Sequence, residues 1–279
     1  MSNRCTLDGV ILSSRSLRLA VVSDIYSEFH KDPQWLPPIP PDIDLLILVG
    51  DIGLGTQALE TIQCIAKYNP RTKIAWVAGN HEFYGNNIDL LRNTFRDAFI
   101  EHEQITYLDN SHVTINGWTI LGSTLWSGFD WLGTELRSHV MKTVQSSISD
   151  FHVIRKGSNN EKFTPTDALE FCKESRDRLE QHLSECNKDK TIVATHFPPS
   201  VKLKHPSFPI DELTAYFIAC CDDLIENHSP KYWVYGHNHW SDSIQIKSTT
   251  LIINQLSYPN EKGVIPPYNK QFIIELKYR

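Results

Sequence analysis

Five strand-length apolar runs along this chain end in Asp, Asn or His, residue types that bind metal ions. The runs are rich in Val and Ile, as is typical of buried strands in an α/β protein. In open α/β sheets, binding sites collect beyond the carboxyl ends of the strands, so we expect the five ends to converge on one crevice. The five runs are LRLAVVSD, DLLILVGD, KIAWVAGN, KTIVATH and KYWVYGH, and a sixth run, TLIIN, follows them.

Helical patterns fall between these runs and predict β-α-β connections. After GDIGLG, Thr56 is placed to cap a helix whose apolar residues recur with a period of about 3.6 residues. That apolar face consists of Ala58, Leu59, Ile62, Ile65 and Ala66. Asn116 and Gly117 interrupt an alternating segment and are the favoured pair of a type I′ hairpin turn. The sheets are therefore expected to contain both parallel and antiparallel pairs.

The segment 131–190 lacks strand patterns and is predicted to be a helical insertion that covers one edge. Thr164, Pro165 and Asp167 are typical of the start of a helix. Its expected apolar face carries Leu169, Cys172, Leu179, Leu183 and Cys186. A chain of 279 residues with 41% apolar residues can bury a sizeable core. We therefore expect residues 1–279 to form one domain.

Charge and cysteine usage narrow the class of protein. The chain carries 27 basic and 33 acidic side chains without a dense Lys/Arg run, which disfavours a binder of nucleic acid. The six cysteines, from Cys5 to Cys221, lack CxxC spacing and are expected to be reduced thiols. The N-terminus lacks a continuous apolar segment, and no apolar run is long enough to span a bilayer. These features predict a cytoplasmic protein with no membrane partner, and they do not mark an oligomeric state.

The polar residues at the strand ends favour a shared metal site. Taken singly, a Gly-Asp pair is often a turn, and an isolated His is usually packed or exposed. Only a shared site requires all of the following together: Asp24, Asp51, Asn80, His196, His237 and His239. Such donors suit first-row divalent ions, and one carboxylate can bridge two ions about 3.5 Å apart. Asp51 is the natural bridge, since Gly50 and Gly53 permit close backbone approach.

The same donors suggest a reaction. Two bridged ions lower the pKa of a shared water and clamp the oxygens of a phosphate ester, so that hydroxide attacks phosphorus in line. His81, next to Asn80, is expected near the leaving group as an acid or charge stabiliser. Glu82 is expected to orient an imidazole. Asp51 and His81 are therefore the candidate catalytic residues.

The order D-x-(H), GD, GNHE, H and GHxH resembles the motif set of the calcineurin-like metallophosphoesterase superfamily and spans Asp24 to His239. The phrases GDIGLGTQALE, GNHEFYG, LGSTLW and THFPPS resemble a bacterial cytosolic branch of that superfamily. The resemblance implies an α/β (α+β) fold, namely a four-layer αββα sandwich of two mixed sheets flanked by helices.

The resemblance also implies a site for two divalent or mixed-valence transition-metal ions, with Mn, Fe and Zn as the leading candidates. It assigns Asp24, Asp51 and His239 to the first ion. It assigns Asp51, Asn80, His196 and His237 to the second ion. The identity of the metals stays open, because these ligand types tolerate several ions.

The chain departs from the family at Tyr26, where histidine is normal. In one interpretation a Tyr26 phenolate binds the first ion and favours Fe³⁺, similar to purple acid phosphatases, whose tyrosine comes from a different motif position. In a second interpretation, which we favour, Tyr26 is neutral and only fills space, because a free tyrosine titrates near pH ~10. Asp24, Asp51 and His239 then hold the first ion weakly. In a third, the fold has lost its chemistry and serves as a binding module, although the other ligand positions are intact.

Four residues are expected to contact the substrate: Asn80, His81, Tyr84 and His205. Phe83 and Tyr84 follow the GNHE turn, and either stacking on the substrate or packing behind the turn is open to them. Lys202 and Lys204 lie in the loop with His205 and are expected to be solvated. Tyr258 is expected either to reach the rim of the crevice or to pack as an ordinary aromatic residue.

The predicted function is hydrolysis of a phosphomonoester or phosphodiester by a metal-bridging hydroxide, with a weakened first metal site because of Tyr26. The partner is a small phosphate-ester substrate, whose identity the sequence leaves open. One alternative is a catalytically impaired phosphoesterase fold that binds a nucleotide or a protein. Another is an enzyme with one tightly held ion at Asn80, His196 and His237 and a loosely held partner ion.

Overall fold

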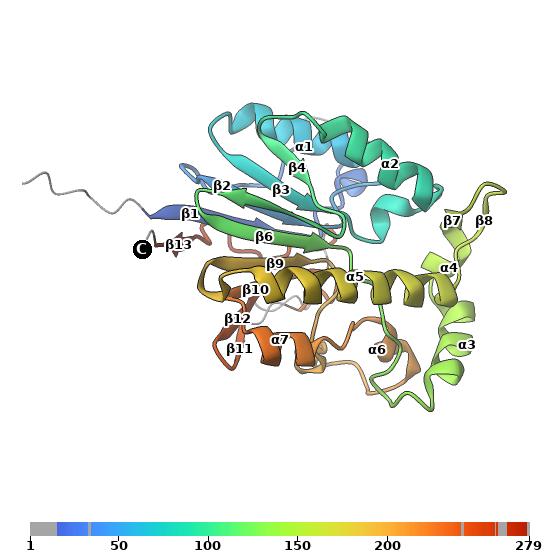
Figure 1. The fold of residues 1–279 in the computed structure, drawn as a ribbon. Coiled ribbons are helices and arrows are strands. Elements are labelled where there is room, and N and C mark those ends of the chain that lie inside the picture. The colour runs from blue at the N-terminus through green and yellow to red at the C-terminus, as the bar shows by residue number, and fades with distance from the viewer. Residues whose placement is uncertain (1–15, 33–34, 241–242, 260, 262–266, 278–279) are drawn as a thin grey trace, which may run out of the picture.

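Two β-sheets stack face to face between two layers of helices (Figure 1). The computed structural model describes residues 16–32, 35–240, 243–259, 261 and 267–277. The expected single domain of residues 1–279 therefore begins and ends outside the described residues, and Cys5 lies there too.

The first sheet has four parallel strands and one antiparallel edge strand. In spatial order they are β13 (Ile274–Leu276), β1 (Leu17–Val22), β2 (Leu45–Val49), β3 (Lys73–Val77) and β4 (Ile105–Tyr107). Leu19 pairs with Leu45, and Leu45 in turn pairs with Lys73, so the carboxyl ends of β1, β2 and β3 lie side by side.

The second sheet has four parallel central strands between two antiparallel edge strands. In spatial order they are β11 (Ile244–Ile246), β12 (Thr249–Ile252), β10 (Tyr232–Val234), β9 (Thr191–Thr195), β6 (Trp118–Ser123) and β5 (Ser111–Ile115). Asn116 and Gly117 join β5 to β6 with φ values of 50° and 79°, which confirms the predicted type I′ hairpin.

The helices cover the outer faces of the two sheets. The helices α1 (Gln57–Tyr68) and α2 (Ile88–Phe99) pack on the first sheet, and α5 (Pro165–Glu185) and α7 (Asp222–His228) pack on the second (Figure 1). A separate apolar cluster fills the space between the sheets and includes Leu19, Ile47, Val77, Ile120 and Val234. The predicted four-layer αββα sandwich is confirmed.

The segment 131–190 is mostly helical, as predicted, and includes α3 (Arg137–Ser147), α4 (Asp150–Val153) and α5. Thr164 and Asp167 form the capping box at the start of α5. Its buried side chains run from Pro165 to Leu183, and the helix lies against the outer face of the second sheet, where it contacts β6 (Figure 1). Two-residue strands, β7 (Arg155–Lys156) and β8 (Glu161–Lys162), also pair where no strand was predicted. Such short pairs leave no periodic pattern.

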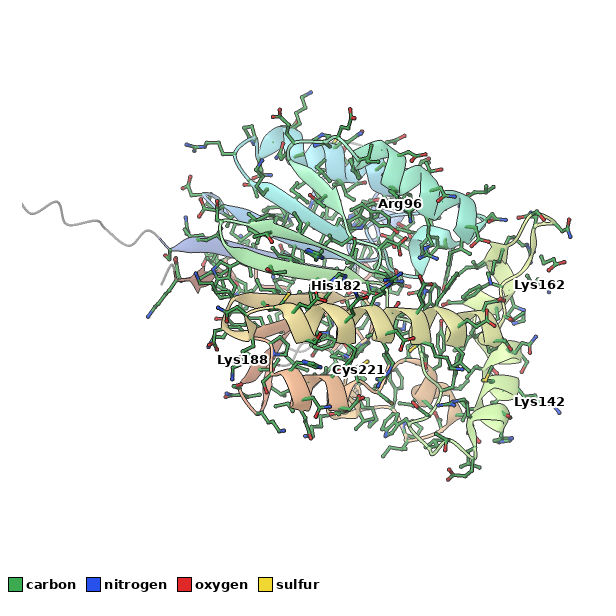
Figure 2. The ribbon with its side chains drawn as sticks, in the orientation of Figure 1. Arg96, Lys142, Lys162, His182, Lys188 and Cys221 are labelled. Carbon is green, nitrogen blue, oxygen red and sulfur yellow. The ribbon has the colours of Figure 1, made fainter. Side chains whose placement is uncertain are left out.

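Shorter elements complete the description. The helix α6 (Glu212–Tyr216) packs against α3. Single 3₁₀ turns span Ser27–Phe29, His81–Phe83, Lys188–Lys190 and Val201–Leu203. Within the described ranges, no helix is long and apolar enough to cross a bilayer. Figure 2 shows the side chains on this framework, with Lys142 on α3, Lys162 on β8 and Lys188 in the 3₁₀ turn before β9.

Candidate metal centre

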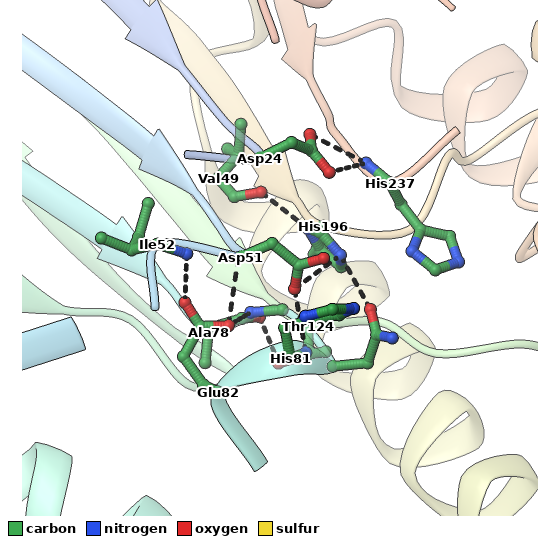
Figure 3. A network of polar contacts seen from close by, with 12 residues as sticks. Asp24, Val49, Asp51, Ile52, Ala78, His81, Glu82, Thr124, His196 and His237 are labelled. Carbon is green, nitrogen blue, oxygen red and sulfur yellow. Dashed lines mark hydrogen bonds and ion pairs between the residues drawn. The ribbon is translucent and has the colours of Figure 1, made fainter. Parts of the chain in front are cut away.

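The carboxyl ends of strands from both sheets meet at one end of the sandwich. The backbone of Ser23, just after β1, pairs with Gln255 of the second sheet. The His237 backbone N–H donates to both oxygens of Asp24 at 3.2 Å. The ring of His196 reaches back to the first sheet, where its Nδ1 lies 2.8 Å from the carbonyl oxygen of Val49 (Figure 3). These contacts bring the expected strand ends together.

The turns that carry the acidic residues have unusual backbones. Asp24, Asp51 and His237 have φ values of 53°, 55° and 75°, in the left-handed region that non-glycine residues rarely adopt. Residues held in this way concentrate at functional sites. The buried Glu82 carboxylate accepts the backbone N–H groups of Asp51, Ile52 and Gly79 at 3.0, 2.7 and 2.8 Å. Glu82, expected to orient an imidazole, instead holds the backbone of these turns, and no hydrogen bond from it to an imidazole is found among the described residues.

Four donor groups surround one point, and we call them the second-ion set: Asp51, Asn80, His196 and His237. One donor atom each from Asp51, His196 and His237 lies within 4.8 Å of the other two. The Asn80 Oδ1 lies 3.0 Å from the His196 Nε2. All four side chains are buried.

The second-ion set fits a transition-metal ion. The His196 Nδ1 donates to a carbonyl oxygen, so Nε2 is the ring nitrogen that faces Asp51 and Asn80 and would bind an ion once its proton is displaced. The His237 Nε2 is buried and has no hydrogen-bond partner among the described residues. A buried nitrogen without a partner is unfavourable, and a metal ion supplies the missing interaction.

The ring charges within this set differ from those of free histidines. Burial alone would lower the pKa of His196, but the neighbouring Asp51 carboxylate outweighs burial and raises it to about 9. Burial would raise the pKa of Asp51, but His196 and His81 hold it well below its usual value. Burial, reinforced by the His196 charge, lowers the pKa of His237 well below its usual value, so this ring is neutral.

Tyr26 lies among the donors that the family resemblance assigns to the first ion. Its hydroxyl lies 3.0 Å from the Asp51 Oδ2, 3.3 Å from the Asp24 Oδ1 and 2.8 Å from the His239 Nε2. Burial and the nearby Asp51 and Asp24 carboxylates raise the pKa of Tyr26 well above its usual value, so the phenol is neutral. Asp24, Asp51 and His239 thus already contact the Tyr26 hydroxyl. They do not fit an ion at the centre of the three side chains. The His239 Nδ1 lies 2.8 Å from Glu261, a residue that the motifs did not indicate.

A cavity of about 500 Å³ opens over these donors. The four residues predicted to contact substrate all line it: Asn80, His81, Tyr84 and His205. Lys204 lines it too, but its Nζ is bound to backbone carbonyl oxygens of His205 and Phe208. Phe83 instead lies in the core, so only Tyr84 of that aromatic pair faces the cavity. Tyr258 reaches the rim, where its hydroxyl lies 3.2 Å from the His81 Nε2.

Comparison with known proteins identifies the family. Residues 17–241, most of the chain, match the family described as calcineurin-like phosphoesterase. The chain belongs to this family. The prediction of a hydrolase acting on phosphate esters is thereby confirmed. An uncharacterized protein of Acanthamoeba polyphaga mimivirus is 28% identical over 256 residues, which cover 86% of this phosphoesterase and 85% of the viral protein.

Solved structures share the fold of this phosphoesterase. A phosphopantetheinyl hydrolase from Mycobacterium tuberculosis superimposes with a TM-score of 0.72 at 16% identity, covering 94% of this chain and 96% of that one. A protein of Thermus thermophilus has a TM-score of 0.51 at 12% identity, covering 86% and 89% of the two chains. At these identities the likeness supports the architecture only.

Asp150 fixes the amide of Asn80 in the phosphoesterase site. This buried carboxylate, on α4, accepts hydrogen bonds from the Asn80 Nδ2 at 3.2 Å and the Tyr84 hydroxyl at 2.6 Å, and another from the Tyr216 hydroxyl. Because a carboxylate only accepts, the Asn80 nitrogen turns toward Asp150 and its oxygen turns toward His196. No sequence pattern indicated Asp150, because it lies in the insertion, away from the strand-end motifs.

We expect Asp150→Asn to weaken Mn²⁺ binding by roughly 10- to 100-fold, the usual effect of losing a group that orients a ligand. An amide at this position offers only one accepting oxygen to the three donors. Isothermal titration of the stripped protein measures the affinity, and the exposed Asp189→Asn serves as the matched control. Equal affinities for the two variants would contradict a role for Asp150 in positioning Asn80.

We expect Mn²⁺ to bind more tightly as the pH rises from about 6 to about 8, by up to roughly tenfold per unit for each proton displaced. The physical reason is that His196, whose pKa is raised by Asp51, holds a proton that the ion must replace. Titrations at constant ionic strength measure this slope. An affinity that stays constant over the range would show that no such proton is displaced.

Proposed function

We propose that this phosphoesterase hydrolyses a phosphomonoester or phosphodiester in the cavity, using a transition-metal ion held by Asp51, Asn80, His196 and His237. The observation that carries the proposal is the buried His237 Nε2, which has no hydrogen-bond partner among the described residues and belongs to the cluster with Asp51 and His196. When bound there, the ion supplies a Lewis acid for the phosphate oxygens and a water of lowered pKa.

His81 is the proposed acid for the leaving oxygen. Its backbone N–H donates to the Asp51 Oδ1 at 3.0 Å, which ties the residue to the second-ion set. Burial alone would lower the pKa of the His81 imidazole, but Asp51 and Glu28 outweigh it and raise the pKa above its usual value. The ring therefore keeps its proton to a higher pH than a free histidine does. Tyr258 and Glu28 flank its two nitrogens at 3.2 and 3.5 Å and fix its direction at the cavity wall.

The cavity wall favours an ester with an apolar or aromatic portion. Tyr84 stacks on the His81 ring with centroids 4.2 Å apart, and Phe208, Leu213 and Phe217 line the cavity beyond it. Aromatic and aliphatic walls bind the neutral part of a ligand, while the few polar groups orient the phosphate. The proposed substrate is therefore a small phosphate ester rather than a nucleic-acid chain.

Hydrolysis of para-nitrophenyl phosphate and of bis(para-nitrophenyl) phosphate tests the proposal. We expect chelator-stripped protein to be inactive and added Mn²⁺ to restore turnover of at least one ester class. Absence of turnover of both esters at every Mn²⁺ concentration would contradict it and favour the alternative, a binding module for a nucleotide or protein. The cytoplasmic location is also part of the proposal, and it is supported by the free thiols of the five described cysteines.

A further inference from the structure

The hydroxyl of Tyr26 lies where three donors converge. Asp24, Asp51 and His239 each present one atom to this oxygen, at 3.3, 3.0 and 2.8 Å. Transition-metal ions bind carboxylate oxygen and imidazole nitrogen at about 2.0–2.2 Å. An ion shared by these three donors would therefore coincide with the phenol oxygen, and an ion placed to one side would lose at least one of them.

The Tyr26 ring is fixed in this position. It is 2% exposed, and it stacks on Tyr258 with ring centroids 4.1 Å apart. The edge of His81 packs against it at 4.8 Å. The Tyr26 backbone N–H donates to the Asp51 carbonyl oxygen at 3.0 Å. The backbone hydrogen bond fixes the Cα of Tyr26, and swinging the hydroxyl away would break both ring contacts, so an incoming ion does not displace the ring without losing that packing.

The two oxygens of Asp51 are divided between the two sides of the site. Its Oδ1 lies 3.3 Å from the His196 Nε2, on the side of the second-ion set. Its Oδ2 lies 3.0 Å from the Tyr26 hydroxyl. In a centre with two ions this carboxylate would bridge them. Here Oδ1, which also accepts the His81 backbone N–H, faces the second-ion set, and Oδ2 accepts a hydrogen bond from the Tyr26 hydroxyl.

We propose that this phosphoesterase holds a single metal ion, at Asp51, Asn80, His196 and His237, and that the Tyr26 hydroxyl takes the place of the other ion of the family. The inference rests on the proposed function, because it concerns the same site. A single-ion centre replaces two expectations from the sequence, namely a centre with two ions and a first metal site that binds its ion weakly. Tyr26 then acts as a positioning residue, since its hydroxyl holds the Asp51 carboxylate for the one ion.

Counting the ions retained by three proteins tests the inference. The chelator-stripped chain, Tyr26→Phe and Tyr26→His are dialysed against Mn²⁺, and elemental analysis gives the ions per chain. We expect about one ion in the unaltered protein and in Tyr26→Phe, whose ring still blocks the position, and about two in Tyr26→His, which restores a ligand. We also expect Tyr26→Phe to bind its ion roughly tenfold more weakly, because Asp51 loses its hydrogen-bond donor.

The outcomes separate this inference from the proposed function. Two ions in the unaltered protein would overturn the single-ion inference and leave the proposed function standing. A visible phenolate-to-iron absorption in the Fe³⁺-loaded protein would overturn it as well, because it would make Tyr26 a ligand. A protein that retains no ion in any of the three forms would overturn the proposed function itself. Circular dichroism of each variant establishes that the counts come from folded protein.

Discussion

His237→Ala should lose more than about 100-fold in both Mn²⁺ affinity and ester hydrolysis, since even residues that only orient a ligand contribute 10- to 100-fold. The His237 Nε2 has no hydrogen-bond partner among the described residues, so its loss breaks no hydrogen bond of that nitrogen. Its ring stacks between Phe197 and Phe217, with centroids 4.1 and 5.0 Å away, so truncation also removes some packing.

The control for this variant is His139→Ala, because the side chain of His139 is 64% exposed and lies on α3 outside the metal centre. Metal content by elemental analysis and kcat/KM for an aryl phosphate ester are measured for both variants. Retention of both normal metal content and normal activity by His237→Ala would show that the ion is held elsewhere. Normal metal content with lost activity would instead assign His237 a role in the reaction only.

Gly50→Ala should lower the free energy of unfolding by about 3 kcal/mol or more, one of the large effects expected when a side chain meets fixed backbone atoms. Gly50 has a φ of 86°, and a Cβ atom there would lie 2.3 Å from the His196 Nδ1 and 2.7 Å from the Gly79 Cα. The substitution would force apart the two turns that carry Asp51 and Asn80. Metal affinity and activity should fall with stability.

Gly117→Ala is the matched control, because Gly117 has a similar φ of 79° but no atom within 4 Å of the added Cβ. Its free energy of unfolding should fall by only about 1–2 kcal/mol, the cost of placing a residue with a Cβ atom in the left-handed backbone conformation. Urea unfolding measures both variants, and the difference between them reports the close approach at the metal centre. Equal losses would mean that the backbone around Gly50 relaxes and that the tight packing of these turns is not required.

The positions of the candidate ligands could be predicted because each follows a local pattern. A buried strand leaves a short apolar run, and the residue after it lies at the sheet end, so Asp24, Asp51 and His196 could be placed from neighbouring letters alone. The family motifs then supplied the order. The same runs indicate the buried strands of an α/β protein, and the four-layer sandwich came from the resemblance to the family.

The residues around the ligands could not be predicted in this way. Asp150 reaches Asn80 across 70 positions of sequence, and Glu261 reaches His239 across 22, so their roles depend on tertiary placement. Tyr26 could be recognised from the sequence as a departure from the family motif. The position of its side chain relative to Asp51 could not be predicted, because it depends on the left-handed backbone at both residues, with φ values of 51° and 55°. No periodic pattern encodes such turns.

The most direct test is a stepwise titration of the stripped protein with Mn²⁺ in which bound ion and hydrolysis of an aryl phosphate ester are followed together. We expect the rate to rise in proportion to bound Mn²⁺ and to level off at about one ion per chain. A rate that begins only as a second ion binds would contradict the single-ion centre. A protein that binds Mn²⁺ and hydrolyses neither a monoester nor a diester would contradict the proposed phosphoesterase activity.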